Sequence, residues 1–185
     1  FEVGHLTPAW FIPAVGNVIV PVAGARMGFI EVSWLFFSVG MMFWGVLLTL
    51  VMNRLVFHDP IPARLFPTMV ILIAPPSVAF VAYVTMSGVV DGFARSLIYV
   101  AYLFAALVVA QIPRLARLPF ALSWWALSFP LAALTIASLL FARLEGTAAH
   151  QAIGLGVLTI LSLDEIGLIY RTIVALLRGE LCNPD

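Results

Sequence analysis

The hydrophobic positions of this sequence form six long stretches, separated by short polar connections that carry most of the charge. A run of about 20 apolar residues can cross the hydrocarbon core of a bilayer as an α-helix. The pattern therefore predicts spans at about residues 7–25, 29–52, 65–86, 93–112, 120–141 and 148–177. We expect an all-α integral membrane protein, with residues 1–185 in a single transmembrane domain.

Proline divides these spans into two kinds. The first, third and fifth spans (the odd spans) contain prolines, and the second, fourth and sixth (the even spans) have none in their interiors. The prolines are Pro8, Pro13, Pro21, Pro67, Pro75, Pro76 and Pro130. Because proline lacks an N–H and its ring clashes with the preceding turn, each odd span should be kinked.

A hairpin of one kinked and one regular helix recurs three times, at a spacing of about 55 residues, which indicates an internal repeat. Broken helices in corresponding positions of such repeats usually mark a transport pathway. We therefore expect the odd helices to line an interior and the even helices to face lipid around them.

The fifth span contains the break with the clearest consequence. Pro130 lies near its middle, directly after Phe129, and should kink the helix and free the carbonyl of Ala126. A freed carbonyl in hydrocarbon needs a partner, and the span offers hydroxyl groups for this purpose. We expect the ring of Phe129 to lie beside the bend and to face the inside of the bundle.

The odd helices offer only neutral polar groups to a transport path. The candidate pore-lining residues are Pro13, Asn17, Thr68, Pro75, Ser77, Ser128, Pro130 and Thr135. Since the sequence places no Asp, Glu, Lys, Arg or His in the interior of an odd helix, the path should bind an anion weakly enough to release it. The alternative is that each hydroxyl bonds only to the backbone of its own helix.

Acidic residues within the spans occur only on even helices. Glu31 lies near a helix start, and Asp164 and Glu165 fall in the middle of the last span. A charge at the bilayer centre costs about 2.5–3.5 kcal/mol on insertion scales, so these two carboxyls should be paired, protonated or near an interface. Two roles stay open for them, a structural contact with another helix and a proton relay.

Composition excludes several classes of function. Hydrophobic residues make up 63% of the chain and charged residues only 10%, which is far less charge than soluble domains carry. Nine basic residues, all arginine, balance nine acidic ones without forming a cluster, so we expect no nucleic-acid partner. His5, His58 and His150 have no zinc-binding spacing and Cys182 is the single cysteine, so we expect no metal site and no cofactor. Hydrolase, P-loop and dinucleotide motifs are missing from the sequence, so we do not expect an enzyme.

The arginines indicate an orientation. With six spans, both termini share a side with the connections after the second and fourth spans. That side has Arg54, Arg64, Arg114, Arg117, Arg171 and Arg178, and the other side has Arg26, Arg95 and Arg143. Positive charge accumulates on the cytoplasmic side of membrane proteins, so we expect the carboxyl terminus to be cytoplasmic, in the plasma or inner membrane.

Three stretches carry a family resemblance: LTPAWFIPAVGNVIVP, LFPTMVILIAPPSVAFVAY and FALSWWALSFPLAA. They resemble segments of the tellurite-resistance/dicarboxylate transporter family, which includes the plant slow-type anion channels and fungal malate and sulfite transporters. The resemblance covers essentially the whole chain. It implies ten helices in five hairpins, five kinked odd helices around a pore, five outer helices, and frequent assembly as a homotrimer. It also implies that Phe129 is the phenylalanine that occludes the pore.

By this resemblance the six spans correspond to the last six helices of the family fold, so we expect the chain to be part of a longer protein. The function we expect is transport of small anions across the lipid bilayer through a channel-like pore. One alternative is a proton-coupled carrier of C4-dicarboxylates or sulfite that uses Asp164 or Glu165. Another is a membrane scaffold subunit that transports nothing.

Overall fold

The computed structural model describes residues 6–179, and every regular element within them is helical. His5 and Cys182 lie outside the described residues. The α-helices are α1 (Phe11–Gly24), α2 (Ile30–Phe57), α3 (Ala74–Ser87), α4 (Gly92–Ala110), the short α5 (Ile112–Leu115), α6 (Ser128–Glu145) and α7 (Ala148–Leu177). Three 3₁₀ segments are η2 (Pro8–Trp10), η3 (Ala63–Ile73) and η4 (Leu122–Leu127). The expected all-α fold is confirmed.

Each odd span is built from two pieces, a 3₁₀ segment followed by an α-helix with proline in its first turn. The pairs are η2 with α1, η3 with α3, and η4 with α6. Pro13, Pro76 and Pro130 each occupy the third position of the α-helix that follows. A proline in a first turn removes no intrahelical hydrogen bond, because the first N–H groups of a helix have no partner within it. The expectation that Pro130 interrupts the interior of one long helix was therefore wrong, since the change of helix type precedes it, at Ser128.

Five helical spans among the described residues are long and apolar enough to cross a membrane. They are Ile30–Phe57, Ala63–Ser87, Gly92–Ala110, Leu122–Glu145 and Ala148–Leu177. The remaining apolar helix, Pro8–Gly24, is shorter. Several spans run past the boundaries expected from the sequence, by five residues at the end of α2 and by four at the end of α6. The chain is a multi-pass membrane protein.

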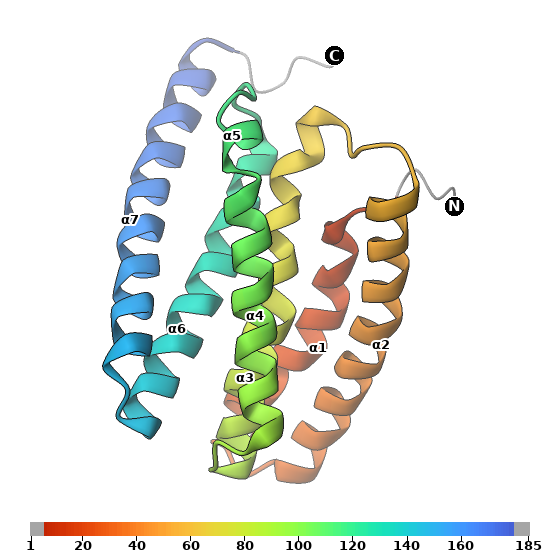
Figure 1. The fold of residues 1–185 in the computed structure, drawn as a ribbon, viewed down its shortest axis with the longest axis vertical. Coiled ribbons are helices and arrows are strands. Elements are labelled where there is room, and N and C mark those ends of the chain that lie inside the picture. The colour runs from red at the N-terminus through yellow and green to blue at the C-terminus, as the bar shows by residue number, and fades with distance from the viewer. Residues whose placement is uncertain (1–5, 180–185) are drawn as a thin grey trace.

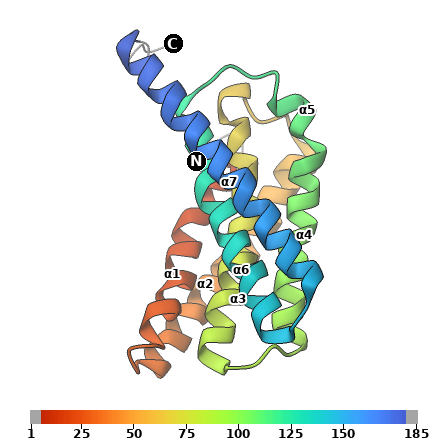
Figure 2. The same cartoon turned by 90° about the vertical axis from the view of Figure 1, so that its left-hand side faces the viewer.

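The helices form three hairpins around a central span. α1 pairs with α2, α3 with α4, and α6 with α7, and α3 also contacts both α1 and α6. In Figure 1, α7 and α2 lie at the two sides of the bundle, and in Figure 2 α7 crosses in front of α6. In the most apolar 18-residue stretch of each span, 89% of the residues of the third span are buried within the chain, compared with 22%, 28% and 11% for the second, fourth and sixth. The even helices therefore present their apolar side chains outward.

Two glycines allow the hairpin partners to approach closely. At Gly40 an added Cβ would lie 2.9 Å from the carbonyl oxygen of Ala14 and 2.5 Å from the side chain of Val18. At Gly154 it would lie 2.7 Å from the side chain of Leu139. These positions therefore fix the register of α2 against α1 and of α7 against α6.

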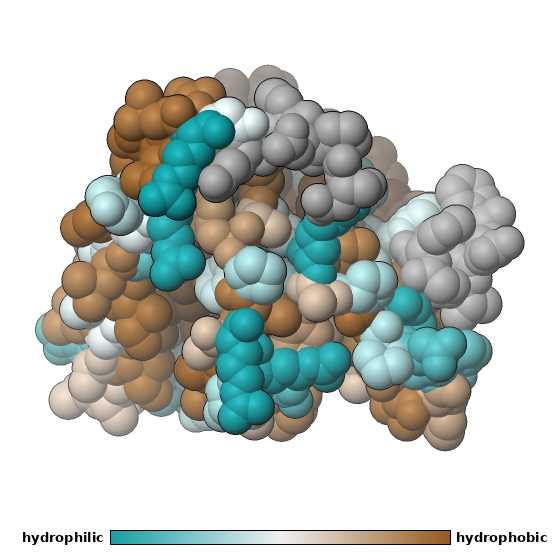
Figure 3. Space-filling model, turned by 90° about the horizontal axis from the view of Figure 1, so that it is seen from above, coloured by the Kyte–Doolittle hydropathy of each residue, from teal (hydrophilic) through white to brown (hydrophobic). Residues whose placement is uncertain are grey.

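The connections after α2 and α4 lie at the end of the bundle where α1 begins and α7 ends (Figure 1). Figure 3 looks down on this end, where hydrophilic side chains gather toward the middle and hydrophobic side chains surround much of the rim. Arg114 lies over the ring of Phe66, with its guanidinium carbon 4.3 Å from the ring centroid. This end corresponds to the arginine-rich side expected to be cytoplasmic.

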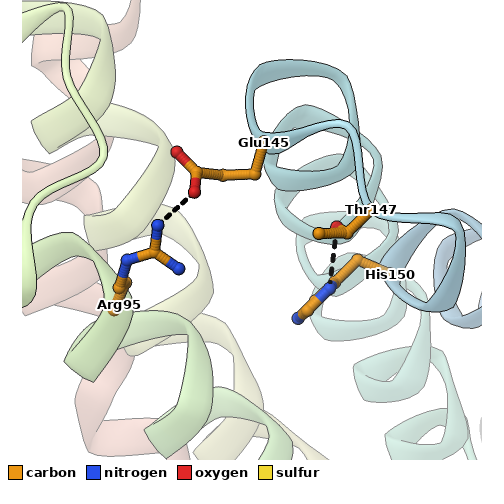
Figure 4. Close-up of polar contacts among 4 residues, drawn as sticks. All are labelled: Arg95, Glu145, Thr147 and His150. Carbon is orange, nitrogen blue, oxygen red and sulfur yellow. Dashed lines mark hydrogen bonds and ion pairs between the residues drawn. The ribbon is translucent and has the colours of Figure 1, made fainter.

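The opposite end is held by polar contacts between neighbouring hairpins. Arg95 of α4 forms an ion pair with Glu145 at the end of α6, and the hydroxyl of Thr147 is 2.9 Å from Nδ1 of His150 (Figure 4). The His150 ring lies against Phe141, with centroids 4.2 Å apart. These contacts join α4, α6 and the start of α7.

Candidate functional site

An apolar cavity of about 370 Å³ lies where the three odd spans meet. α1 contributes one wall, the junction of η3 and α3 a second, and the junction of η4 and α6 a third. The lining residues are Ile12, Val15, Gly16, Ile19, Ile71, Ala74, Ala126, Phe129 and Pro130. Each of the three walls comes from a proline-containing span, and two of them lie at a change from 3₁₀ to α-helix.

Phe129 and Pro130 are the two predicted site residues that line this cavity. Phe129 is the second residue of α6, and its side chain is 45% exposed. A ring in this position narrows an apolar space without offering any hydrogen bond. The cavity lining has no charged side chain and almost no polar surface.

The other predicted pore-lining residues do not line the cavity. Thr68, Ser77 and Thr135 are buried, and each hydroxyl donates to a carbonyl of its own span, at 2.6, 2.7 and 2.8 Å respectively. Asn17 donates its amide to the carbonyl of Pro13 in the same way, at 2.9 Å. Pro75 is buried next to the lining residue Ala74. These polar groups satisfy the backbone around the proline sites within the described chain.

Ser128 and Asp164 differ from the other predicted site residues. Oγ of Ser128 and Oδ2 of Asp164 are both buried and have no hydrogen-bond partner among the described residues. Ser128 is the first residue of α6, directly before Phe129, and Asp164 lies on α7. Its neighbour Glu165 has no such buried atom. The two adjacent carboxyls therefore have different surroundings.

Arg54 is a buried residue that the sequence analysis assigned to a connecting loop. It belongs to the last turn of α2, its side chain is 4% exposed, and its Nε and Nη1 atoms have no hydrogen-bond partner among the described residues. An arginine at the polar end of an apolar run usually marks the interface, and no signal in the sequence distinguishes a buried arginine from an exposed one there.

Comparison with known proteins identifies relatives. A sequence model of the family described as voltage-dependent anion channel matches residues 1–173. The chain is 28% identical over 167 residues to the S-type anion channel SLAH3 of Arabidopsis thaliana, which covers 90% of this chain and 26% of that protein. It is 27% identical over 136 residues to the guard cell S-type anion channel SLAC1 of the same plant, covering 74% of this chain and 24% of that one.

Methanocaldococcus jannaschii also has a similar protein. The chain is 26% identical over 202 residues to an uncharacterized transporter of Methanocaldococcus jannaschii, covering 97% of this chain and 59% of the transporter. The chain thus spans between about a quarter and three-fifths of the length of these curated relatives.

Proposed function

Because the chain belongs to the voltage-dependent anion channel family, we propose that the complete protein conducts small anions through a pore lined by the odd helices and occluded by Phe129. The observation that carries this proposal is the position of Phe129 on the wall of the cavity where the three odd spans meet. An aromatic ring at a narrow apolar point closes a path by excluding water, because an anion there loses its hydration without compensation.

The chemistry of the walls supports a channel more than a tight binding site. The cavity is lined by apolar side chains, and the hydroxyls of Thr68, Ser77 and Thr135 are already bonded to backbone carbonyls. Conduction requires that an ion be bound weakly enough to leave. We propose that Pro13, Asn17, Pro75 and Pro130 shape the backbone of the path around this cavity.

The test is anion flux into liposomes that contain the complete protein. Phe129→Ala should raise passive chloride and nitrate flux severalfold, because removal of the ring widens the narrow point. Phe43→Ala is the matched control, since Phe43 lies on α2 with a similar exposure of 49% and does not line the cavity. Unchanged flux in Phe129→Ala, at equal amounts of reconstituted protein, would contradict the gating role. Zero flux for chloride, nitrate, sulfite and malate in every variant would favour a membrane scaffold.

A proton-coupled carrier of dicarboxylates or sulfite is the second candidate, and the buried, unpartnered Oδ2 of Asp164 is the observation that favours it. Ionisable groups within membrane spans often belong to proton pathways. A carrier would accumulate malate or sulfite when a pH gradient is imposed, and Asp164→Asn would abolish that accumulation while leaving passive chloride flux unchanged.

We further propose that the protein resides in the cell membrane as a homotrimer with its carboxyl terminus in the cytoplasm. Six of the nine arginines lie on the side of the carboxyl terminus. Cys182, the single cysteine of this chain, provides the topological test once other cysteines of the complete protein are replaced. A membrane-impermeant maleimide should label it in inside-out vesicles and leave it unlabelled in intact cells. The mass of the protein in detergent tests the trimer.

A further inference from the structure

The register of α6 and α7 places Ser128 and Asp164 at the same depth. Gly154 lies directly against Leu139, which fixes one point of contact between the two antiparallel helices. Ser128 is eleven residues before Leu139, and Asp164 is ten residues after Gly154. At a rise of about 1.5 Å per residue, both lie about 15–16 Å from that contact, in the same direction along the bundle.

The two residues also lie on or near the faces through which α6 and α7 contact each other. Eleven residues make about three full turns, so Ser128 lies on the face of α6 that carries Leu139. Ten residues bring Asp164 within about a quarter of a turn of the face of α7 that carries Gly154. Farther along, Nε1 of Trp125 donates to the hydroxyl of Thr172 at 3.0 Å, so η4 and α7 stay in contact beyond this level.

Both facing groups are left without a hydrogen bond in this structure. Oγ of Ser128 and Oδ2 of Asp164 are buried and have no partner among the described residues. A buried polar group without a partner loses its hydrogen bonds to water and forms none in their place, which costs free energy. A serine hydroxyl can donate to an ionised carboxylate or accept from a protonated one, so the two groups are chemically matched in either protonation state.

Ser128 is directly connected to the cavity through the chain. It is the first residue of α6, and the next two residues, Phe129 and Pro130, both line the cavity. By helix periodicity Ser128 lies about 100° around α6 from Phe129, on the face that carries Leu139. Any movement of Ser128 toward α7 therefore carries the backbone of Phe129 with it.

We propose that Asp164 is a positioning residue for Phe129: its carboxyl bonds the hydroxyl of Ser128 in the conducting state and draws the start of α6, with the Phe129 ring, away from the cavity. The present structure, in which the bond is not made and Phe129 lines the cavity, is the closed arrangement. This proposal rests on the proposed gating function of Phe129.

The main experiment is chloride flux through liposomes that contain the complete protein. Ser128→Ala and Asp164→Leu should each lower flux by about threefold to tenfold, the effect of losing one hydrogen bond from the conducting state. Ser128→Thr and Asp164→Asn keep a hydrogen-bonding group and should retain most of the flux. Ser162→Ala is the control on α7 and should leave flux unchanged, because Ser162 is exposed and donates only to Leu158 of its own helix.

The background of Phe129→Ala separates a positioning role from a merely structural one. When the ring is absent, Ser128→Ala and Asp164→Leu should no longer change flux, because they act only through Phe129. A reduction that persists in this background, or unchanged flux in the single variants, would overturn the proposal. If Phe129→Ala alone leaves flux unchanged, the gating function itself is wrong.

A cross-linking experiment tests the pairing apart from gating. Ser128→Cys with Asp164→Cys, in a protein otherwise free of cysteine, should be joined by a short bifunctional thiol reagent, and the joined protein should conduct at or above the level of the unjoined one. Failure to join in conducting liposomes would refute the pairing even if Phe129 proves to be the gate. Joining that abolishes flux would refute the assignment of the bonded form to the conducting state.

Discussion

The third and the last spans are similarly apolar in sequence, yet the third is mostly buried within the chain and the last is mostly exposed. In the most apolar 18-residue stretch of the third span, Ala63–Ser87, 89% of the residues are buried within the chain, compared with 11% in the corresponding stretch of the last span, Ala148–Leu177. Both are long and apolar enough to cross the membrane. Hydropathy alone therefore does not distinguish a helix surrounded by protein from one that faces lipid, because lipid tails are as apolar as a protein core.

The difference lies in how the two spans satisfy their own backbone. The third span has three prolines and divides into η3 and α3, whose irregular junction is covered on several sides by α1, α4 and α6. The last span is one continuous α-helix of 30 residues, in which the backbone groups between the first and last turns are bonded internally. An irregular backbone in a membrane requires protein around it, and a regular helix does not. Proline content is therefore the sequence feature that separates core spans from outer spans here.

Truncation of a large side chain should lower the free energy of unfolding far more in the third span than in the last. Phe80 of α3 is fully buried and packs against Phe141 of α6, with ring centroids 5.9 Å apart. Phe80→Ala leaves a cavity between two hairpins and should lower the free energy of unfolding by about 3–5 kcal/mol. Ile166→Ala, at a position 67% exposed on α7, is the control and should change it by less than about 0.5 kcal/mol. Reversible unfolding in mixed micelles measures both, and equal losses would refute the division into core and outer spans.

Glycine-to-alanine substitutions on α7 should show that only one face of this helix packs against the rest of the chain. At Gly154 an added Cβ would lie 2.7 Å from the Leu139 side chain and 3.2 Å from its backbone nitrogen, so Gly154→Ala must separate α6 from α7. We expect a loss of about 1–3 kcal/mol in the free energy of unfolding. Gly156 has nothing within 4 Å of an added Cβ, so Gly156→Ala should be neutral or stabilising, as is usual for glycine to alanine within a helix. A similar loss at both positions would argue that the effect is not packing.

The outer helix should also support the irregular backbone of the fifth span. The hydroxyl of Thr172 accepts a hydrogen bond from Nε1 of Trp125 in η4, at 3.0 Å. Thr172→Val keeps the shape and removes the bond, which should cost about 1 kcal/mol. The control is Thr159→Val on the same helix, because the hydroxyl of Thr159 donates only to the carbonyl of Leu155. Equal melting temperatures of the two variants would indicate that α7 contributes nothing to η4.

Much of this fold follows from the sequence because membrane spans are long and their composition is uniform. The last span was predicted with the bounds that the structure shows, 148–177. The second was predicted to end at residue 52, whereas α2 continues to Phe57 and buries Arg54. Polar residues at the end of an apolar run indicate the edge of the hydrocarbon, but a helix can continue beyond that edge because its backbone is bonded internally. The 3₁₀ segments were not predicted, since proline indicates a break without indicating the type of helix on either side.

The candidate site was predicted only in part, for a related reason. Phe129 and Pro130 line the cavity, and their roles as gate and pore wall stay predictions. The hydroxyls were selected because they are polar, but Ser77 and Thr135 bond to the carbonyls four residues before them. The sequence shows which side chains are polar, but it does not show whether a hydroxyl bonds to its own helix or points into a pore. The proposed pairing of Ser128 with Asp164 rests on the helix register that Gly154 and Leu139 set, and this register depends on contacts between helices.

The smallest effect is expected at the turn that joins the core helix α3 to the outer helix α4. Asp91 caps α4, where its Oδ1 accepts from the N–H of Ala94 at 2.9 Å and its Oδ2 accepts from the hydroxyl of Tyr83 at 2.5 Å. The bond from Ala94, and then that from Tyr83, lowers the pKa of Asp91 below its ordinary value of 3.8. A lowered pKa in the folded state means that this carboxylate stabilises the fold above the ordinary pKa, and that the contribution disappears as pH falls through the folded pKa.

Asp91→Asn isolates that contribution, because its amide oxygen still accepts from Ala94 and does not titrate. The melting temperature of the wild-type protein should exceed that of Asp91→Asn by a constant small amount near about pH 7, and the difference should shrink as the carboxylate is protonated toward about pH 2. Asp91→Ala removes the cap, so its melting temperature should lie below those of the wild type and of Asp91→Asn at every pH. A difference between wild type and Asp91→Asn that stays constant over this range would show that the carboxylate charge is not what stabilises the turn. In that case the hydrogen-bond geometry of the cap, and not the charge of its carboxylate, would be what stabilises the turn between α3 and α4.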